Sequence, residues 1–363
     1  MFFEQIPTQY SLFFILYGGT AIMALIAAVY LCLRRSNAFA PGVTPPVRLR
    51  RWATTFFGFA FLSHVWWFLF YIYSNDFNSV LCLVVAVVDY LALLTSVAGM
   101  LFAMLQDRKR HIWPLVVAML PYAVLLSMNV LYPDRYFLHL SIAYLVLILL
   151  IFSIYMVFAV RQYGQWLRDN YADLEHKEVW VSHVLIISIL LLFTFDGVAG
   201  LNIAISYFVQ FAQFFLFSFL VWRVETLPQL ETETGTITAD QHPQQPMAIP
   251  SNIEQLLAEH CVDTKFYLQH DLTLLQLAQA IGTNRLYLSQ YFSRQGITYN
   301  AYINDLRIQH FIALYHEKTS AGQPFIAQQL ASDSGYRSYS TFSLAFKQRM
   351  GQSVTAWLRN TAD

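Results

Sequence analysis

The chain has 363 residues, which is enough for two domains, and 57% of them are hydrophobic while only 12% are charged. Its formal net charge is zero, yet residues 1–223 carry most of the apolar content and residues from 271 onward are mildly basic. The three cysteines, Cys32, Cys82 and Cys261, lie far apart and none has metal-ligand spacing, which excludes a disulfide framework and a zinc site.

Apolar segments long enough to cross roughly 30 Å of hydrocarbon recur along the first part of the chain. Seven are predicted, at residues 11–33, 52–73, 79–105, 112–132, 137–160, 179–197 and 201–222. The first lacks a preceding basic stretch and is longer than a signal-peptide core, so it is expected to be a true span. The sixth is interrupted by Asp196, Gly197 and Gly200, and a six-helix alternative merges or discards one of the last two segments.

Basic residues gather in the loops after the first, third and fifth of these segments. Those loops hold Arg34, Arg35, Arg48, Arg50, Arg51, Arg108, Lys109, Arg110, Arg161, Arg168 and Lys177. The opposite loops hold only Arg135. This asymmetry predicts a bacterial inner-membrane protein with its N-terminus outside, and seven spans place everything after Arg223 in the cytoplasm. Six spans would leave the C-terminal part outside.

Two ionisable residues lie near the middle of predicted spans. Asp89 is about ten residues into the third segment, and His64 lies at a similar depth in the second. A carboxylate at that depth is costly and is expected to face the bundle interior. Asp89 and His64 are therefore candidate signal-sensing residues, with a hydrogen bond that fixes helix packing as the alternative. The outside loops are too short to form a binding domain, so a signal must enter through the bundle or its outer mouth.

The longest inside loop, "RQYGQWLRDNYADLEHKEVW", is predicted to be helical. Its apolar residues fall along one side: Tyr163, Trp166, Leu167, Tyr171 and Leu174. This pattern is typical of a helix resting on the membrane interface. A coupling or dimer surface for the C-terminal domain is the alternative.

After Arg223 the chain changes character. Residues 224–250 are polar, contain prolines and show no periodicity, as a flexible linker does. Helical periodicity then returns, and "LTLLQLAQAIGTNRLYLSQYFSRQG" predicts a helix, a turn at Gly282-Thr283 and a second helix capped at Asn284. The same pattern recurs in "FIAQQLASDSGYRSYSTFSLAFKQRMG", with Gly335 at the turn. Two helices meeting at a glycine turn form the motif that places its second helix in a DNA major groove.

Residues 250–360 resemble the AraC-type transcriptional regulators. The resemblance rests on the two units about 50 residues apart and on Tyr302 and Arg307, which begin the helix that links them. It implies that one monomer reads two successive major-groove segments with its two second helices. By position, the DNA-binding residues are Arg285, Leu286, Ser289 and Gln290 in the first unit, and Tyr339, Ser340, Ser343 and Leu344 in the second. The family commonly has arginine in place of Gln290 and Leu344. Phe292, Phe342 and Phe346 are expected in the core, and Arg307 is expected to brace the linking helix.

The sequence therefore predicts an all-α protein: a seven-helix transmembrane bundle at 1–223, a flexible linker at 224–250 and an AraC-like double helix-turn-helix domain at 251–363. No catalytic motif is present, so neither an enzyme nor a cofactor is expected. The predicted function is a membrane-embedded one-component transcription regulator. Its expected partners are double-stranded DNA, the lipid bilayer, a small-molecule or lipid signal, a second copy of the chain, and RNA polymerase. The alternatives are a transporter or channel with a degenerate helix-turn-helix tail used for protein contacts, and an enzyme acting on lipid within the bundle.

Overall fold

The computed structural model describes residues 8–34, 36–73, 80–132, 136–199, 203–230 and 252–362. All regular elements in these ranges are helical, which confirms the all-α prediction. The chain forms two compact units. The first comprises Met1–Tyr163 and Val179–Glu233, and the second comprises Gly164–Glu178 and Thr234–Asp363.

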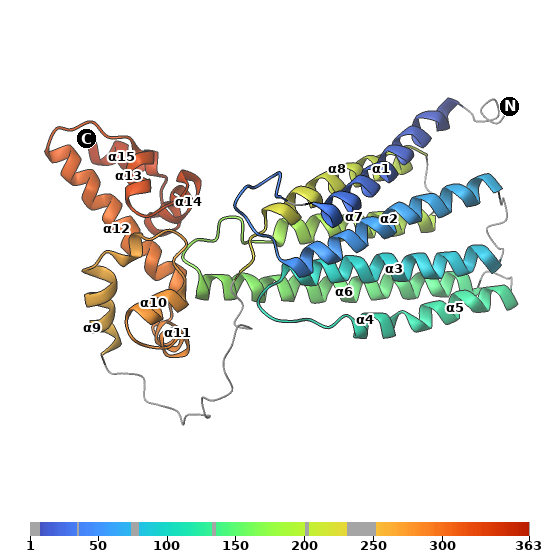
Figure 1. Cartoon of the computed structure of the whole chain (residues 1–363), viewed down its shortest axis with the longest axis horizontal. Helices are drawn as coiled ribbons and strands as arrows, with labels where there is room; N and C mark the ends of the chain where they lie inside the picture. The colour runs from blue at the N-terminus through green and yellow to red at the C-terminus, as the bar shows by residue number, and fades with distance from the viewer. Residues whose placement is uncertain are drawn as a thin grey trace, which may run out of the picture. The chain divides into compact units, whose positions relative to one another are not determined.

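The first unit is a bundle of long apolar helices that run side by side (Figure 1). These are α1 Thr8–Leu33, α2 Val47–Tyr73, α3 Val80–Met104, α4 Trp113–Ala118, α5 Leu120–Leu131, α6 Tyr136–Asn170, α7 Trp180–Ala199 and α8 Ile203–Thr226. α1 packs against α2 and α8, α2 against α3, and α7 against α8. Within the described residues, five helices are long and apolar enough to cross a membrane: α1, α2, α3, α6 and α8. The count of seven spans stays a prediction.

Two predicted segments differ from the helices that form. The fourth is divided at Met119 into α4 and α5, and a proline stands in the first turn of each. Pro121 has no N–H to continue the helix of α4, and its ring clashes with the carbonyl four residues before it, so the helix breaks there. The fifth segment was predicted to end at residue 160, but α6 continues to Asn170.

Large apolar side chains point outward from the bundle. Ile15 is 70% exposed, Ile26 62% and Ile151 59%. Soluble proteins rarely leave such side chains in contiguous exposed patches, because water penalises apolar surface. Hydrocarbon removes that penalty, so this surface is suited to a bilayer.

The chain segments that carry the predicted inside loops meet at one end of the bundle. Arg34 Nη1 lies 2.9 Å from the buried carboxylate of Glu225, and Arg48 Nη2 donates to the Arg110 carbonyl over 3.1 Å. Arg108 Nη2 donates to Gln162 Oε1 over 2.7 Å. The loops that follow α1 and α3, the later part of α6 and the end of α8 are thus at the same end of the first unit.

Residues 224–230, the first part of the expected linker, belong to this packed end. Leu227 is fully buried, the Gln229 amide donates to the Thr44 carbonyl over 2.9 Å, and the Leu230 amide donates to Gln106 Oε1 over 2.8 Å. The rest of the expected linker, residues 231–250, lies outside the described residues.

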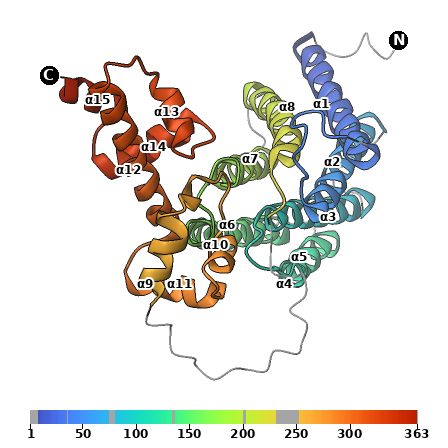
Figure 2. The same cartoon turned by 60° about the vertical axis from the view of Figure 1, so that its left-hand side comes forward.

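The second unit is built on one long helix, α12, with a helix pair at each of its ends (Figure 2). Its elements are α9 Ile253–Leu257, the π-helical turn η2 Ala258–Val262, the 3-10 turn η3 Phe266–Leu268, α10 Leu274–Ala280, α11 Arg285–Arg294, α12 Tyr299–Ser320, α13 Ala327–Asp333, α14 Tyr339–Met350 and α15 Val354–Ala362. Its two cores each include one end of α12. Phe292 lies in the first, and Phe342 and Phe346 in the second, which confirms the three core predictions.

Candidate functional site

The second helix of each helix-turn-helix unit begins with a side-chain cap. Asn284 Oδ1 accepts the amide of Tyr287 over 2.9 Å at the start of α11, as the sequence predicted. Ser338 Oγ accepts the amide of Thr341 over 3.3 Å at the start of α14. A cap satisfies amides that no helical carbonyl can reach, so both helices have defined N-terminal ends. We call α11 and α14 the reading helices.

The eight predicted DNA-binding residues divide into exposed and half-buried sets. The exposed ones are Leu286, Gln290, Ser340 and Leu344, and the half-buried ones are Arg285, Ser289, Tyr339 and Ser343. The Tyr339 ring packs 5.7 Å from that of Phe342, so part of this side chain belongs to the core. Leu286 and Leu344 are 64% and 61% exposed. An exposed leucine on a reading helix offers an apolar surface to a thymine methyl group.

The chain between α6 and α7 packs onto this same unit. The Ala172 amide donates to the Leu272 carbonyl over 3.0 Å, Asn300 Nδ2 donates to the Ala172 carbonyl over 2.5 Å, and Tyr171 forms an antiparallel bridge with Thr273. Ala172 is buried in the first core of the unit. The prediction of an interfacial helix is therefore wrong beyond Asn170, where α6 ends. We call Gly164–Glu178 the docked segment.

A buried ion pair anchors the docked segment. Arg307, on α12, is fully buried, and its Nη1 lies 2.9 Å from Asp173 Oδ1. Its Nε and Nη2 donate to the carbonyls of Tyr267 and Gln269, each over 2.8 Å. The other Asp173 oxygen accepts the amide of Asp271 over 2.7 Å. A buried guanidinium is stable only when it is paired and hydrogen-bonded, so Arg307 is a brace, as predicted, and not a base contact.

On either side of this anchor, the docked segment contacts one reading helix. Asn170 Oδ1 accepts hydrogen bonds from Nε and Nη2 of Arg285, the first residue of α11, over 2.8 and 2.5 Å. Glu175 Oε2 accepts from Ser338 Oγ over 2.7 Å and from Thr341 Oγ1 over 2.9 Å, at the start of α14. The sequence analysis missed both contacts. The available signal was a set of carboxylates in a loop where basic residues were expected.

Asp271 joins the docked segment to the second helix-turn-helix unit. Its carboxylate lies 3.1 Å from Lys177 Nζ and 2.6 Å from Arg337 Nη2. Partial burial raises the pKa of Asp271, but the Lys177 ammonium and the Arg337 guanidinium outweigh it, so the pKa lies below its usual value.

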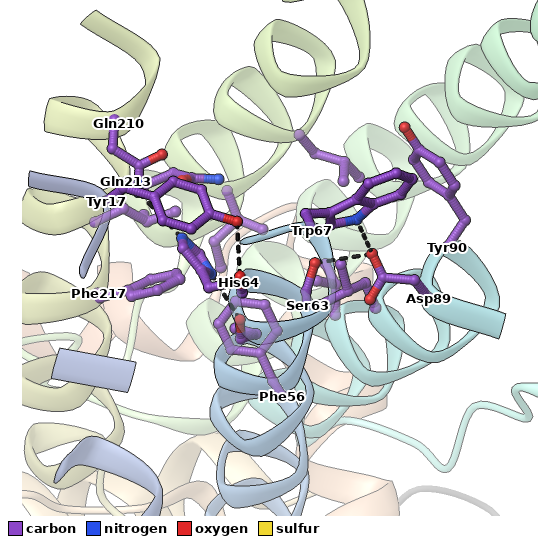
Figure 3. A pocket seen from close by; sticks show the side chains of 16 residues that line it. Tyr17, Phe56, Ser63, His64, Trp67, Asp89, Tyr90, Gln210, Gln213 and Phe217 are labelled. Carbon is purple, nitrogen blue, oxygen red and sulfur yellow. Dashed lines mark hydrogen bonds between the residues drawn. The ribbon is translucent and has the colours of Figure 1, made fainter. Parts of the chain in front are cut away.

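The first unit has a partly open cavity of about 430 Å³, and both candidate sensing residues line it (Figure 3). Asp89 Oδ2 accepts from Ser63 Oγ over 2.8 Å and from Trp67 Nε1 over 2.9 Å. Asp89 is only 6% exposed and faces the bundle interior, as predicted. Neither a lysine nor an arginine is among the described residues that line the cavity.

His64 lies on another wall of the cavity. Its Nδ1 is 2.7 Å from the Ala60 carbonyl, which can only accept, so Nδ1 carries the proton of that bond. Its Nε2 is 3.1 Å from Gln210 Nε2, and the Tyr17 hydroxyl donates to the His64 carbonyl over 3.0 Å (Figure 3). Gln213 Oε1 is buried and has no hydrogen-bond partner among the described residues. The cavity thus combines aromatic walls with a few polar groups, as small-molecule sites do.

Comparison with known proteins identifies the C-terminal part of the chain. A family model described as a helix-turn-helix domain, of the AraC type, matches residues 277–360. Nothing among curated proteins or solved structures matches the chain significantly. Within the described residues, no group of histidine, cysteine and carboxylate side chains could hold a metal ion. Residues 277–360 therefore form an AraC-type helix-turn-helix domain, the kind found in transcription regulators.

Proposed function

We propose that this chain is a membrane-embedded one-component transcription regulator of the bacterial inner membrane. The N-terminal bundle senses a membrane or extracytoplasmic signal, and the C-terminal unit binds specific DNA in the cytoplasm through α11 and α14. The observation that carries the proposal is the presence of two capped reading helices on a chain whose other unit exposes apolar helices. Contacts to DNA are assigned to the eight residues that the family resemblance indicates.

Specific binding to DNA tests this proposal against a transporter with a degenerate tail. The tagged full-length chain is crosslinked in cells and the recovered DNA is sequenced. We expect a small number of enriched sites. Leu286→Glu places a carboxylate on the exposed face of α11 without touching the core, and repulsion from phosphates should abolish enrichment.

Val262→Glu is the matched control. It adds the same charge to another exposed apolar position of the same unit, on η2. Enrichment should survive in this variant. Equal enrichment in the parent and in both variants, or none in any of them, would exclude sequence-specific reading by α11.

The cavity is the proposed signal site, with Asp89 and His64 among its recognition groups. Asp89 is the only acidic residue among the described residues that line the cavity, and a buried carboxylate that no cation neutralises is costly in a low-dielectric bundle. An ammonium group on an otherwise apolar ligand would offset that cost, and the aromatic walls favour such a cation. The proposed ligand class is therefore a small amphiphilic amine.

Calorimetry on the full chain in lipid nanodiscs tests this ligand class. 2-Phenylethylamine and 2-phenylethanol serve as probes because they differ mainly in the charged group. The amine should bind the parent, and its affinity should fall at least tenfold in Asp89→Asn. The affinity of the alcohol should change little between the two chains. Similar binding of the amine to both chains would make Asp89 a packing residue.

A further inference from the structure

We infer that the docked segment Gly164–Glu178 and DNA compete for one surface, the N-terminal ends of the two reading helices. The structure then represents a self-inhibited state of the C-terminal unit. This inference rests on the proposed DNA-binding function and adds an internal competitor to it.

The contacts place one short stretch of chain on both helices at once. Asn170 holds the first residue of α11, and Glu175 holds the cap of α14. These two residues are five positions apart, with Asp173 anchored on buried Arg307 between them. In a helix-turn-helix unit, the first turn of the second helix is the part that enters the major groove. The segment therefore lies on the part of each unit that DNA must reach.

The groups that the docked segment presents resemble those that DNA would present to the same residues. A helix N-terminus is a favourable place for an anion, because its amides are unsatisfied and the helix dipole is positive there. Glu175 puts a carboxylate on Ser338 and Thr341 at that position, as a phosphate would be placed. An incoming phosphate would meet like charge. Asn170 Oδ1 occupies the Nε–Nη2 edge of the Arg285 guanidinium, so that edge cannot fork to a guanine or a phosphate while the contact holds.

The two contacts cost less to break than the anchor between them. Glu175 has 28% of its side-chain surface exposed, its hydrogen-bond partners are neutral hydroxyl groups, and His176 Nε2 lies 3.7 Å from its other oxygen. Asn170 is neutral, so its contact with the Arg285 guanidinium is not an ion pair. The buried Asp173–Arg307 pair is far more costly to break, since it would leave an unpaired buried charge. The segment can therefore release the reading helices while remaining anchored between them.

The test measures the DNA affinity of the full-length chain in lipid nanodiscs. The probe is a labelled duplex selected by the parent chain from a random-sequence library. Glu175→Ala removes the contact to α14, and Asn170→Ala removes the contact to α11. Each variant should bind the duplex roughly tenfold more tightly than the parent at one fixed salt concentration, because each removes a hydrogen-bonded competitor.

Glu317→Ala is the control, because it removes the same charge from an exposed position of the same unit, on α12. It should reproduce only the small effect of reduced net negative charge. If Glu175→Ala and Asn170→Ala bind no more tightly than Glu317→Ala while the parent binds, the inference is wrong and the DNA-binding function stands. If no chain binds any selected duplex, the DNA-binding function is wrong, and the inference is wrong with it.

Hydrogen exchange provides a second readout that does not depend on affinity. Saturating duplex should speed exchange in peptides covering residues 164–170 and 174–178 of the parent chain. A random-coil polyanion of equal charge should speed exchange less, because it has no major groove to receive the reading helices. Unchanged or slower exchange in these peptides with bound duplex would show that the segment and DNA occupy different surfaces.

Discussion

At the scale of single residues, buried Arg307 explains more of the second unit than any predicted contact residue. Its guanidinium joins η3, the docked segment and α12, and it packs 5.4 Å from the Tyr336 ring. It also explains Gly335. That residue has φ +89°, and an added Cβ would lie 2.8 Å from Leu268 backbone atoms and 3.1 Å from Arg307 Nε. The sequence indicated a turn glycine, but not this close approach.

Gly335→Ala should therefore destabilise α13 and α14 more than Gly282→Ala destabilises α10 and α11. Both glycines have positive φ, which costs an L-residue roughly 1–2 kcal/mol. Only Gly335 adds a clash with backbone, whereas a Cβ at Gly282 meets open space. Hydrogen exchange of helix peptides in the full chain gives both local opening free energies. Equal losses of stability in the two variants would show that the Leu268 backbone moves away at little cost.

At the scale of elements, the sequence predicted features that depend on neighbouring residues better than features that depend on residues far along the chain. The Asn284 cap and the two glycine turns of the helix-turn-helix units follow from neighbours within four residues, and the structure confirms them. The end of α6 and the packing of residues 171–178 depend on partners about 100 or more positions away, such as Asp271 and Arg307. Periodicity in one loop cannot reveal such partners. The division of α4 from α5 was readable from Pro121, but the apolar run obscured it.

The cap of α11 allows a direct test of an element that the sequence defined. Asn284→Ala should weaken α11 by about 1 kcal/mol, because the Tyr287 amide loses its acceptor. Gln290→Ala, an exposed change in the middle of the same helix, should alter stability by less than about 0.5 kcal/mol. Hydrogen exchange of the α11 peptide measures the change in stability in both variants. A loss in Asn284→Ala no larger than in Gln290→Ala would mean that water replaces the cap.

The contact between the docked segment and the loop before α10 should depend on pH through Asp271. Its pKa in the folded chain lies below the unfolded value, so the carboxylate contributes stability above that unfolded value, and the contribution is lost as pH falls through the folded pKa. Protection of the Ala172 amide, corrected for intrinsic exchange, should hold from pH 7 to about 5 and fall under stronger acid. Asp271→Asn should lower protection at neutral pH and flatten this profile. An unchanged profile in the variant would assign the acid response to another group.

At the scale of the whole molecule, the chain passes between its two units three times. It enters the second unit at residue 164, leaves it after residue 178 and returns through residues that follow 230. The sequence predicted a bundle and a domain joined only by a flexible linker. The docked segment adds two further covalent connections, through α6 and α7. A change in the bundle therefore has a route to the reading helices that a flexible linker alone would not supply.

Topology is the last prediction. The docked segment and residues 252–362 form one unit, so they must be on the same side of a membrane, and α7 and α8 between them cross it twice or not at all. The contacts Arg34–Glu225 and Arg108–Gln162 place the basic loops at one end of the bundle. Basic loops stay in the cytoplasm. A fluorescent reporter that folds only in the cytoplasm should be active after Arg223, and a phosphatase active only in the periplasm should be active when inserted at residues 74–78. Phosphatase activity after Arg223 would place the reading helices outside, away from DNA, and would exclude the regulator.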